Sequence, residues 1–126
     1  MMRSTAQQSA KKDAVALKLF FGICKEFGFS QNDQAELLCS SRSTINRSQT
    51  KGIQLNKDQM LRISLLAGIY KSACILFGEA GAKRWIRTDH HDPLGPFAGK
   101  SPYDFIMGGD ITHLQKTRRY LDAHRG

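Results

Sequence analysis

The chain has 126 residues, with 19 Lys and Arg against 11 Asp and Glu, and a formal net charge of +8. This length allows one modest hydrophobic core or two very small ones. The positive charge suits an anionic partner, either nucleic acid or an acidic protein. The three cysteines, Cys24, Cys39 and Cys74, are too few and too widely spaced for a disulfide framework or a CxxC zinc site. The first dozen residues contain no apolar signal segment, so a reducing cytoplasm is the expected location.

The apolar pattern predicts an all-α protein. Apolar residues recur with the helical period and strand-like alternation is nearly absent, which indicates five or six helices. The most apolar run, residues 63–77, contains Lys71 and is shorter than the roughly 20 residues that span a bilayer, so we expect no membrane association. Residues 1–12 are polar and are expected to form a flexible arm. A helix from about Asp13 to Gly28 should bury one stripe, made of Ala16, Leu19, Phe20, Ile23 and Phe27.

Two short helices around a polar turn are predicted next. Ser30 and Asp33 can form a capping box at the start of the first, which ends near Leu38. Ser41 can cap the second, over residues 42–49, with Lys51-Gly52 closing it. Three apolar residues should share the core between these helices: Ala35, Leu38 and Ile45.

The segment QNDQAELLCSSRSTINRSQ resembles the Xre-type helix-turn-helix, with Cys39 at the turn position that is usually Gly and Ser48 where an apolar residue is usual. The resemblance implies that the second helix enters the major groove. Guanidinium and carboxamide groups can bind guanine and adenine edges, and hydroxyls can take phosphate oxygens. The expected DNA-contacting residues are Arg42, Ser43, Thr44, Asn46 and Arg47. The alternative is a helix-turn-helix that serves only for packing.

The longest predicted helix starts at Asn56, a good N-cap, and ends at Gly78. It is apolar around nearly its whole circumference, so it must be covered on nearly every side. We therefore predict a homodimer with this helix in its seam, and the alternative is the central helix of a bundle. A shorter helix over residues 79–87 follows. We divide the chain accordingly into the arm, a helix-turn-helix domain with the long helix over residues 13–78, and a C-terminal domain over residues 79–126.

The C-terminal part begins with a loop rich in proline and glycine, in which Pro93, Pro96 and Gly99 prevent regular structure. Ser101-Pro102 should start a short helix that Gly108-Gly109 ends, and Asp110 should cap a last helix. The loop residues His90-His91-Asp92 are adjacent in sequence, and adjacent residues rarely chelate one ion, so we expect a solvated loop without a metal or other cofactor. No nucleophile has an evident base, which argues against an enzyme.

The order of motifs in this part resembles the toxin-binding domain of MbcA/ParS/Xre antitoxins. The matching residues are Trp85, then FAGKSP from Phe97, FIMGG from Phe105, and RYLDA with Arg125-Gly126 at the end. The resemblance implies that the chain neutralises a RES-domain toxin, an enzyme acting on NAD, and that the pair represses its own operon. It also implies a toxin contact through the C-terminal segment, at Arg119, Tyr120, His124, Arg125 and Gly126.

Two alternatives remain open at this point. Arg118 and Arg119 could be a solvated helix end whose charges complement the helix dipole. The whole chain could also be a stand-alone transcriptional regulator without a toxin partner. The aromatic residues of the C-terminal part are expected in the core and not in a contact surface: Trp85, Phe97, Tyr103 and Phe105.

Overall fold

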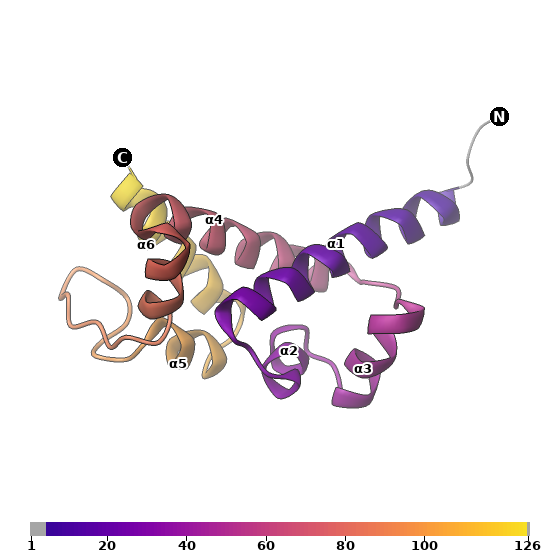
Figure 1. Ribbon diagram of the computed structural model, residues 1–126, viewed down its shortest axis with the longest axis horizontal. Helices are drawn as coiled ribbons and strands as arrows, with labels where there is room; N and C mark the ends of the chain where they lie inside the picture. Colours follow the sequence, from indigo (N-terminus) through magenta and orange to yellow (C-terminus); the bar gives the residue numbers. More distant parts are fainter. Residues whose placement is uncertain (1–4, 126) are drawn as a thin grey trace.

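The computed structural model describes residues 5–125 and confirms the all-α prediction, because this range contains six helices and no strand. The helices are α1 (Thr5–Phe27), α2 (Gln31–Leu37), α3 (Arg42–Lys51), α4 (Lys57–Trp85), α5 (Pro102–Met107) and α6 (Ile111–Arg125). Figure 1 shows α1 and α4 as the two long helices, with α2 and α3 on one side and α5 and α6 at the far end of α4.

Helix α1 begins at Thr5, eight residues before the predicted start at Asp13. The predicted arm over residues 1–12 is therefore wrong for residues 5–12, while residues 1–4 lie outside the described part. Alanine, glutamine and lysine dominate this segment, and all three have high helix propensity. A second correction concerns the buried stripe, since Leu19 is 49% exposed and Leu17 occupies the core position at 4%.

The helix-turn-helix follows the prediction closely. Ser30 and Asp33 form the capping box of α2, and the Ser41 side chain accepts a hydrogen bond from the Thr44 amide at the start of α3. Leu38 and Ile45 are fully buried between the two helices. Gln59 in the first turn of α4 donates to the Leu38 carbonyl at 2.9 Å, so α4 is tied directly to the turn.

Helix α4 is the central element, because it packs on α1 along one side and on α6 along another. Helix α4 is thus the central helix within the chain, and its part in a homodimer stays a prediction. Within residues 5–125, α4 alone is long and apolar enough to cross a membrane by length and composition. Its buried side chains, including Ile63, Leu66 and Ile69, instead contribute to the protein core. Gly78 lies at the predicted break, where a φ of +76° kinks the helix.

The C-terminal part is built around Phe97, which is 1% exposed. Its ring meets those of Trp85, Phe105 and Tyr120 edge to face, with centroids 5.3 to 5.9 Å apart. The prediction that Trp85, Phe97 and Phe105 are core residues is confirmed by their exposures of 9% or less. This aromatic cluster fixes the loop after α4 against α6.

The fourth residue of that prediction, Tyr103, is half-buried and connects the two parts of the chain. Its hydroxyl donates to Asp33 of the α2 capping box at 2.7 Å. The Arg87 guanidinium lies over the Tyr103 ring, 3.8 Å from its centroid, and donates to the Gly28 carbonyl at 3.0 Å. The hydrogen bond to Asp33, more than partial burial, raises the pKa of Tyr103. These contacts set the orientation of the helix-turn-helix relative to α5.

We expect Tyr103→Phe to lower the free energy of unfolding by about 1 to 2 kcal/mol, because Asp33 is 8% exposed and would lose the donor to one carboxylate oxygen. The ring and its contact with Arg87 are retained, so the change isolates the hydrogen bond. Urea unfolding followed by circular dichroism measures the effect. An unchanged midpoint and slope would contradict a stabilising role for this bond.

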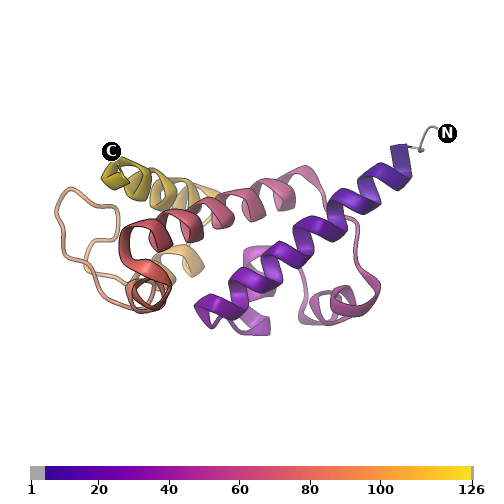
Figure 2. The same cartoon turned by 45° about the horizontal axis from the view of Figure 1, so that its top comes forward.

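The two predicted contact regions are far apart. Figures 1 and 2 both show α3 toward the N-terminal end of the molecule and the C-terminal end of α6 at the opposite end. A single small partner cannot cover both.

Candidate functional site

The first region is the outer face of α3. Four of the predicted DNA-contacting residues are exposed on this face: Arg42, Ser43, Asn46 and Arg47. The fifth, Thr44, is half-buried, and its hydroxyl accepts a hydrogen bond from the Ser41 hydroxyl at 2.9 Å. Ile45 and Ser48 on the opposite side of α3 are buried. All five predicted DNA-contacting residues thus belong to the first turns of one helix.

The electrostatics of this face suit a polyanion. Helix α3 contains three basic residues, Arg42, Arg47 and Lys51, and no acidic one. The Arg47 guanidinium makes one long hydrogen bond, to the Thr44 hydroxyl at 3.5 Å, and is otherwise exposed. Such a side chain can reorient toward a base edge or a phosphate at little cost.

The two departures from the helix-turn-helix pattern have local explanations. Cys39 occupies the turn position that is usually glycine, and its φ of +50° is in the left-handed region that glycine favours. The chain therefore keeps the conformation of the motif although Cys39 has a side chain. Such a conformation costs about 1 kcal/mol for a residue other than glycine. Ser48, at 5% exposure, donates from its hydroxyl to the Ile45 carbonyl at 2.6 Å, so its buried polar group is satisfied within the helix.

The second region is a recess between the loop after α4 and helix α6, with a volume of about 600 Å³. Three of the predicted toxin-contacting residues line it together: Arg119, Tyr120 and His124. The Tyr120 hydroxyl donates a hydrogen bond to the Asp92 carboxylate at 3.2 Å. The pKa of Tyr120 is raised, mainly by partial burial and secondly by this hydrogen bond. The other side of the recess is formed by the loop residues Asp92, Leu94 and Pro96, which the sequence does not predict as part of a contact surface.

The remaining predicted toxin contacts lie elsewhere. Arg125 points to α4, where it donates to the Ser72 hydroxyl at 3.1 Å, and Ser72 in turn donates to Asp122 at 2.9 Å. Gly126 lies outside the described residues. The structure therefore brings together Arg119, Tyr120 and His124 and does not bring Arg125 to the same recess.

The neighbouring arginines of α6 have different environments. The guanidinium of Arg118 lies so close to Gly68 of α4 that any side chain at position 68 would clash with it. Arg118 also forms an ion pair with Asp122, with 3.6 Å between the charged atoms. Arg119 is exposed. The alternative of a solvated helix end therefore fits Arg119 better than Arg118, because the Arg118 side chain packs α6 against α4.

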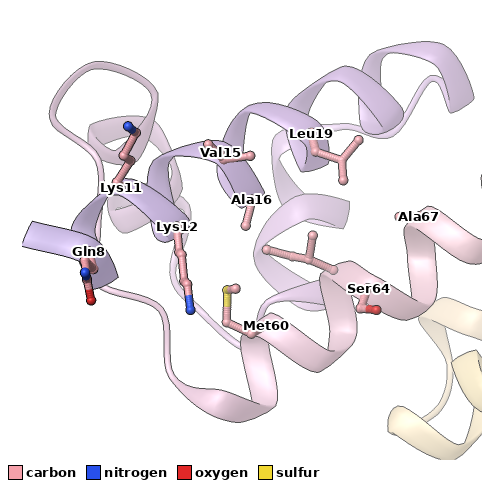
Figure 3. A pocket seen from close by; sticks show the side chains of 10 residues that line it. Gln8, Lys11, Lys12, Val15, Ala16, Leu19, Met60, Ser64 and Ala67 are labelled. Atoms are coloured by element: carbon pink, nitrogen blue, oxygen red, sulfur yellow. The ribbon is translucent and has the colours of Figure 1, made fainter. Parts of the chain in front are cut away.

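A third surface feature is an open groove between α1 and the first half of α4, with a volume of about 810 Å³. Figure 3 shows its walls, with Val15, Ala16 and Leu19 on α1 and Met60 and Ala67 on α4. Val15 is 64% exposed, although it lies among apolar side chains. The sequence pattern did not separate this exposed face of α1 from the buried one.

One of the two loop histidines, His90, contributes to the packing of the loop. Its ring lies between those of Trp85 and Phe97 in a tilted arrangement, and a ring nitrogen lies 3.2 Å from the Trp85 carbonyl. Within residues 5–125, no three His, Cys, Asp or Glu side chains are grouped closely enough to hold a metal ion.

Comparison with known proteins identifies both parts of the chain. Residues 6–68 match the model of the antitoxin Xre-like helix-turn-helix domain, and residues 72–126 match that of the antitoxin Xre/MbcA/ParS C-terminal toxin-binding domain. The uncharacterized protein y4oB of Sinorhizobium fredii (strain NBRC 101917 / NGR234) is 36% identical over 125 residues, which cover 98% of this chain and 93% of that protein. The two matched segments meet within α4, at residues 68–72.

Proposed function

Because this chain belongs to the Xre/MbcA/ParS family of antitoxins, we propose that it neutralises a RES-domain toxin, an enzyme that degrades NAD, by docking its C-terminal surface on that enzyme. The observation that carries the proposal is the recess on α6, where Arg119, Tyr120 and His124 converge in the segment matched as toxin-binding. Tyrosine and arginine are frequent anchors of protein interfaces. A guanidinium on a helix end can also satisfy a carboxylate in the toxin pocket that otherwise holds a ribose of the dinucleotide.

Autoregulation is the second part of the proposal. The exposed basic face of α3 would bind operator DNA. The chain would bind this DNA either alone or in complex with the toxin. The separation between α3 and the end of α6 supports simultaneous binding of both partners (Figure 2). The protein would act in the cytoplasm, where both its DNA and the NAD pool of the toxin are found. The alternative of a regulator without a toxin is less well supported, because the C-terminal match is to a toxin-binding domain.

The function is tested by co-expression. We expect a RES-type gene adjacent to this one. Cells that carry it should stop growing when it is induced alone and should recover when this chain is co-expressed. Intracellular NAD, measured in the same cultures, should fall in the first case and be preserved in the second. Growth arrest that persists with an excess of this chain would refute the proposed function.

A homodimer is the third part of the proposal, and its seam would combine α4 with α1. The exposed face of α1 has apolar side chains at its centre, a lysine toward its start and a glutamate toward its end: Val15, Leu19, Lys12 and Glu26. These four positions are separated by three, four and seven residues, the spacings that place side chains on one face of a helix. An antiparallel pair of α1 helices would bring the Lys12 end of one copy beside the Glu26 end of the other, so the face is complementary to itself.

We expect Leu19→Glu to convert the dimer into a monomer, because it places a charge in the apolar centre of the seam. Light scattering at micromolar concentration should return the mass of two chains for the wild type and one chain for the variant. The matched control is Leu94→Glu, at an apolar position with 93% exposure in the loop after α4 and outside both helices of the seam, which should remain dimeric. A monomeric wild type would refute the homodimer.

A further inference from the structure

The loop between α4 and α5 exposes a single leucine to an unusual degree. Leu94 is 93% exposed, whereas the other exposed large apolar side chains of the described residues range from 44% to 64%. It lies at the rim of the recess that contains Arg119 and Tyr120. Isolated apolar residues on a surface are common, so exposure alone does not assign a role to Leu94.

The second observation is that the loop holds Leu94 in a fixed position. Asp92 accepts hydrogen bonds from the Leu94 amide at 2.9 Å and, through its main-chain carbonyl, from the Gly95 amide at 3.0 Å. The other carboxylate oxygen of Asp92 accepts from Tyr120 of α6 at 3.2 Å. Prolines at positions 93 and 96 restrict the backbone on both sides. An ordered loop loses little conformational entropy when its tip is buried by a partner.

The third observation is the charge around this leucine. Lys116 and Arg119 of α6 line the same recess and are exposed, and His124 lies beside them. Asp92 is the acidic residue of the lining, and its carboxylate is already engaged by Tyr120. An apolar tip with a basic rim matches the usual organisation of protein interfaces, in which a buried anchor is surrounded by polar groups.

We propose that Leu94 is an anchor residue of the toxin interface, which inserts into an apolar depression on the toxin whose rim presents acidic side chains to Lys116 and Arg119. The inference rests on the proposed function and extends it from the C-terminal helix to the loop before α5. A protein is the favoured occupant over DNA, because a leucine side chain gains nothing from a phosphate backbone. A second copy of the chain is disfavoured, because the rim is basic and would repel itself.

The test uses the full-length chain and the purified product of the adjacent RES-type gene, with the dissociation constant measured by isothermal titration calorimetry. Leu94→Ala should weaken binding by about tenfold to a hundredfold, because it removes three buried carbon atoms from the interface. Leu94→Met, which keeps an apolar side chain of similar volume, should bind within about threefold of the wild type. The matched control is Leu61→Ala on α4, a leucine with 45% exposure outside the recess, which should leave the affinity unchanged.

The outcomes separate this inference from the proposed function. If the wild type binds the toxin and Leu94→Ala binds equally well, the anchor role is refuted while the proposed function stands. If the wild type does not bind the toxin at all, the proposed function fails and the anchor role fails with it. Because Leu94 is 93% exposed, we expect both Leu94 variants to keep the circular dichroism spectrum and unfolding midpoint of the wild type.

Discussion

Deletion of residues 123–126 is expected to weaken toxin binding at least about thirtyfold, or about 2 kcal/mol, and to abolish neutralisation in cells. The deletion removes His124 from the recess that also contains Arg119 and Tyr120. It also removes Gly126, one of the predicted contact residues. The dissociation constant measured with the adjacent RES-type gene product, together with growth in the co-expression assay, gives the result.

A deletion that starts at residue 123 leaves the buried residues of α6 in place. Leu121 is fully buried, so a deletion that started at Tyr120 would combine the loss of the interface with the loss of core packing. Residues 123–125 are exposed, and the bond between Arg125 and Ser72 is the main internal contact that disappears with them. The shorter deletion should therefore keep the unfolding midpoint within a few degrees of the wild type. Full neutralisation by a folded, truncated chain would place the interface elsewhere.

Much of the fold could be predicted because its signals are local. The capping residues Ser30, Ser41, Asn56 and Ser101 each accept a hydrogen bond at the helix start where the sequence placed them. Each signal depends only on a short side chain and the backbone amides of the next turn. Helix spacing likewise placed Ile45 of α3 in the core, whereas the apolar circumference of α4 left its buried side undetermined.

The corrections concern features that depend on distant contacts. Whether Leu17 or Leu19 faces inward depends on how α1 crosses α4, and a helix with apolar residues on two faces fits either choice. The engagement of Arg125 by Ser72 joins residues 53 positions apart, and no local pattern encodes it. The division of the chain into domains at residue 78 stays a prediction. Gly78 kinks α4 there, yet the two matched segments meet about ten residues earlier.

The candidate site shows the same limit. The motif residues on α3 could be named because a helix-turn-helix fixes which face is free. The recess on α6 could be named only in part, because its second wall is the loop that carries Asp92 and Leu94. That loop is placed by the packing of Phe97 on Tyr120 and by the bond from Tyr120 to Asp92, which are contacts between segments. A single leucine between two prolines was the available signal, and on its own it does not distinguish an anchor from a loop residue.

The double variant Arg42→Ala/Arg47→Ala is expected to weaken binding to the DNA upstream of this gene at least about thirtyfold at physiological salt. Both side chains are exposed at the start of α3, where a major-groove helix carries its base and phosphate contacts. If each arginine neutralises one phosphate, the slope of log affinity against log salt should become shallower by about 2. Fluorescence anisotropy at several salt concentrations, with and without the toxin, measures both quantities.

The matched control removes the same two charges from a different surface. Lys25→Ala/Lys71→Ala changes exposed residues of α1 and α4, lowers the net charge equally and should leave the salt dependence close to that of the wild type. Neutralisation of the toxin should be unchanged in the Arg42→Ala/Arg47→Ala variant, because α3 and the recess on α6 lie at opposite ends of the molecule (Figure 1). If both double variants weakened DNA binding to the same extent, net charge would explain the binding and α3 would be a packing helix. The combination of intact neutralisation with a selective loss of DNA binding would instead establish two independent surfaces on one small antitoxin.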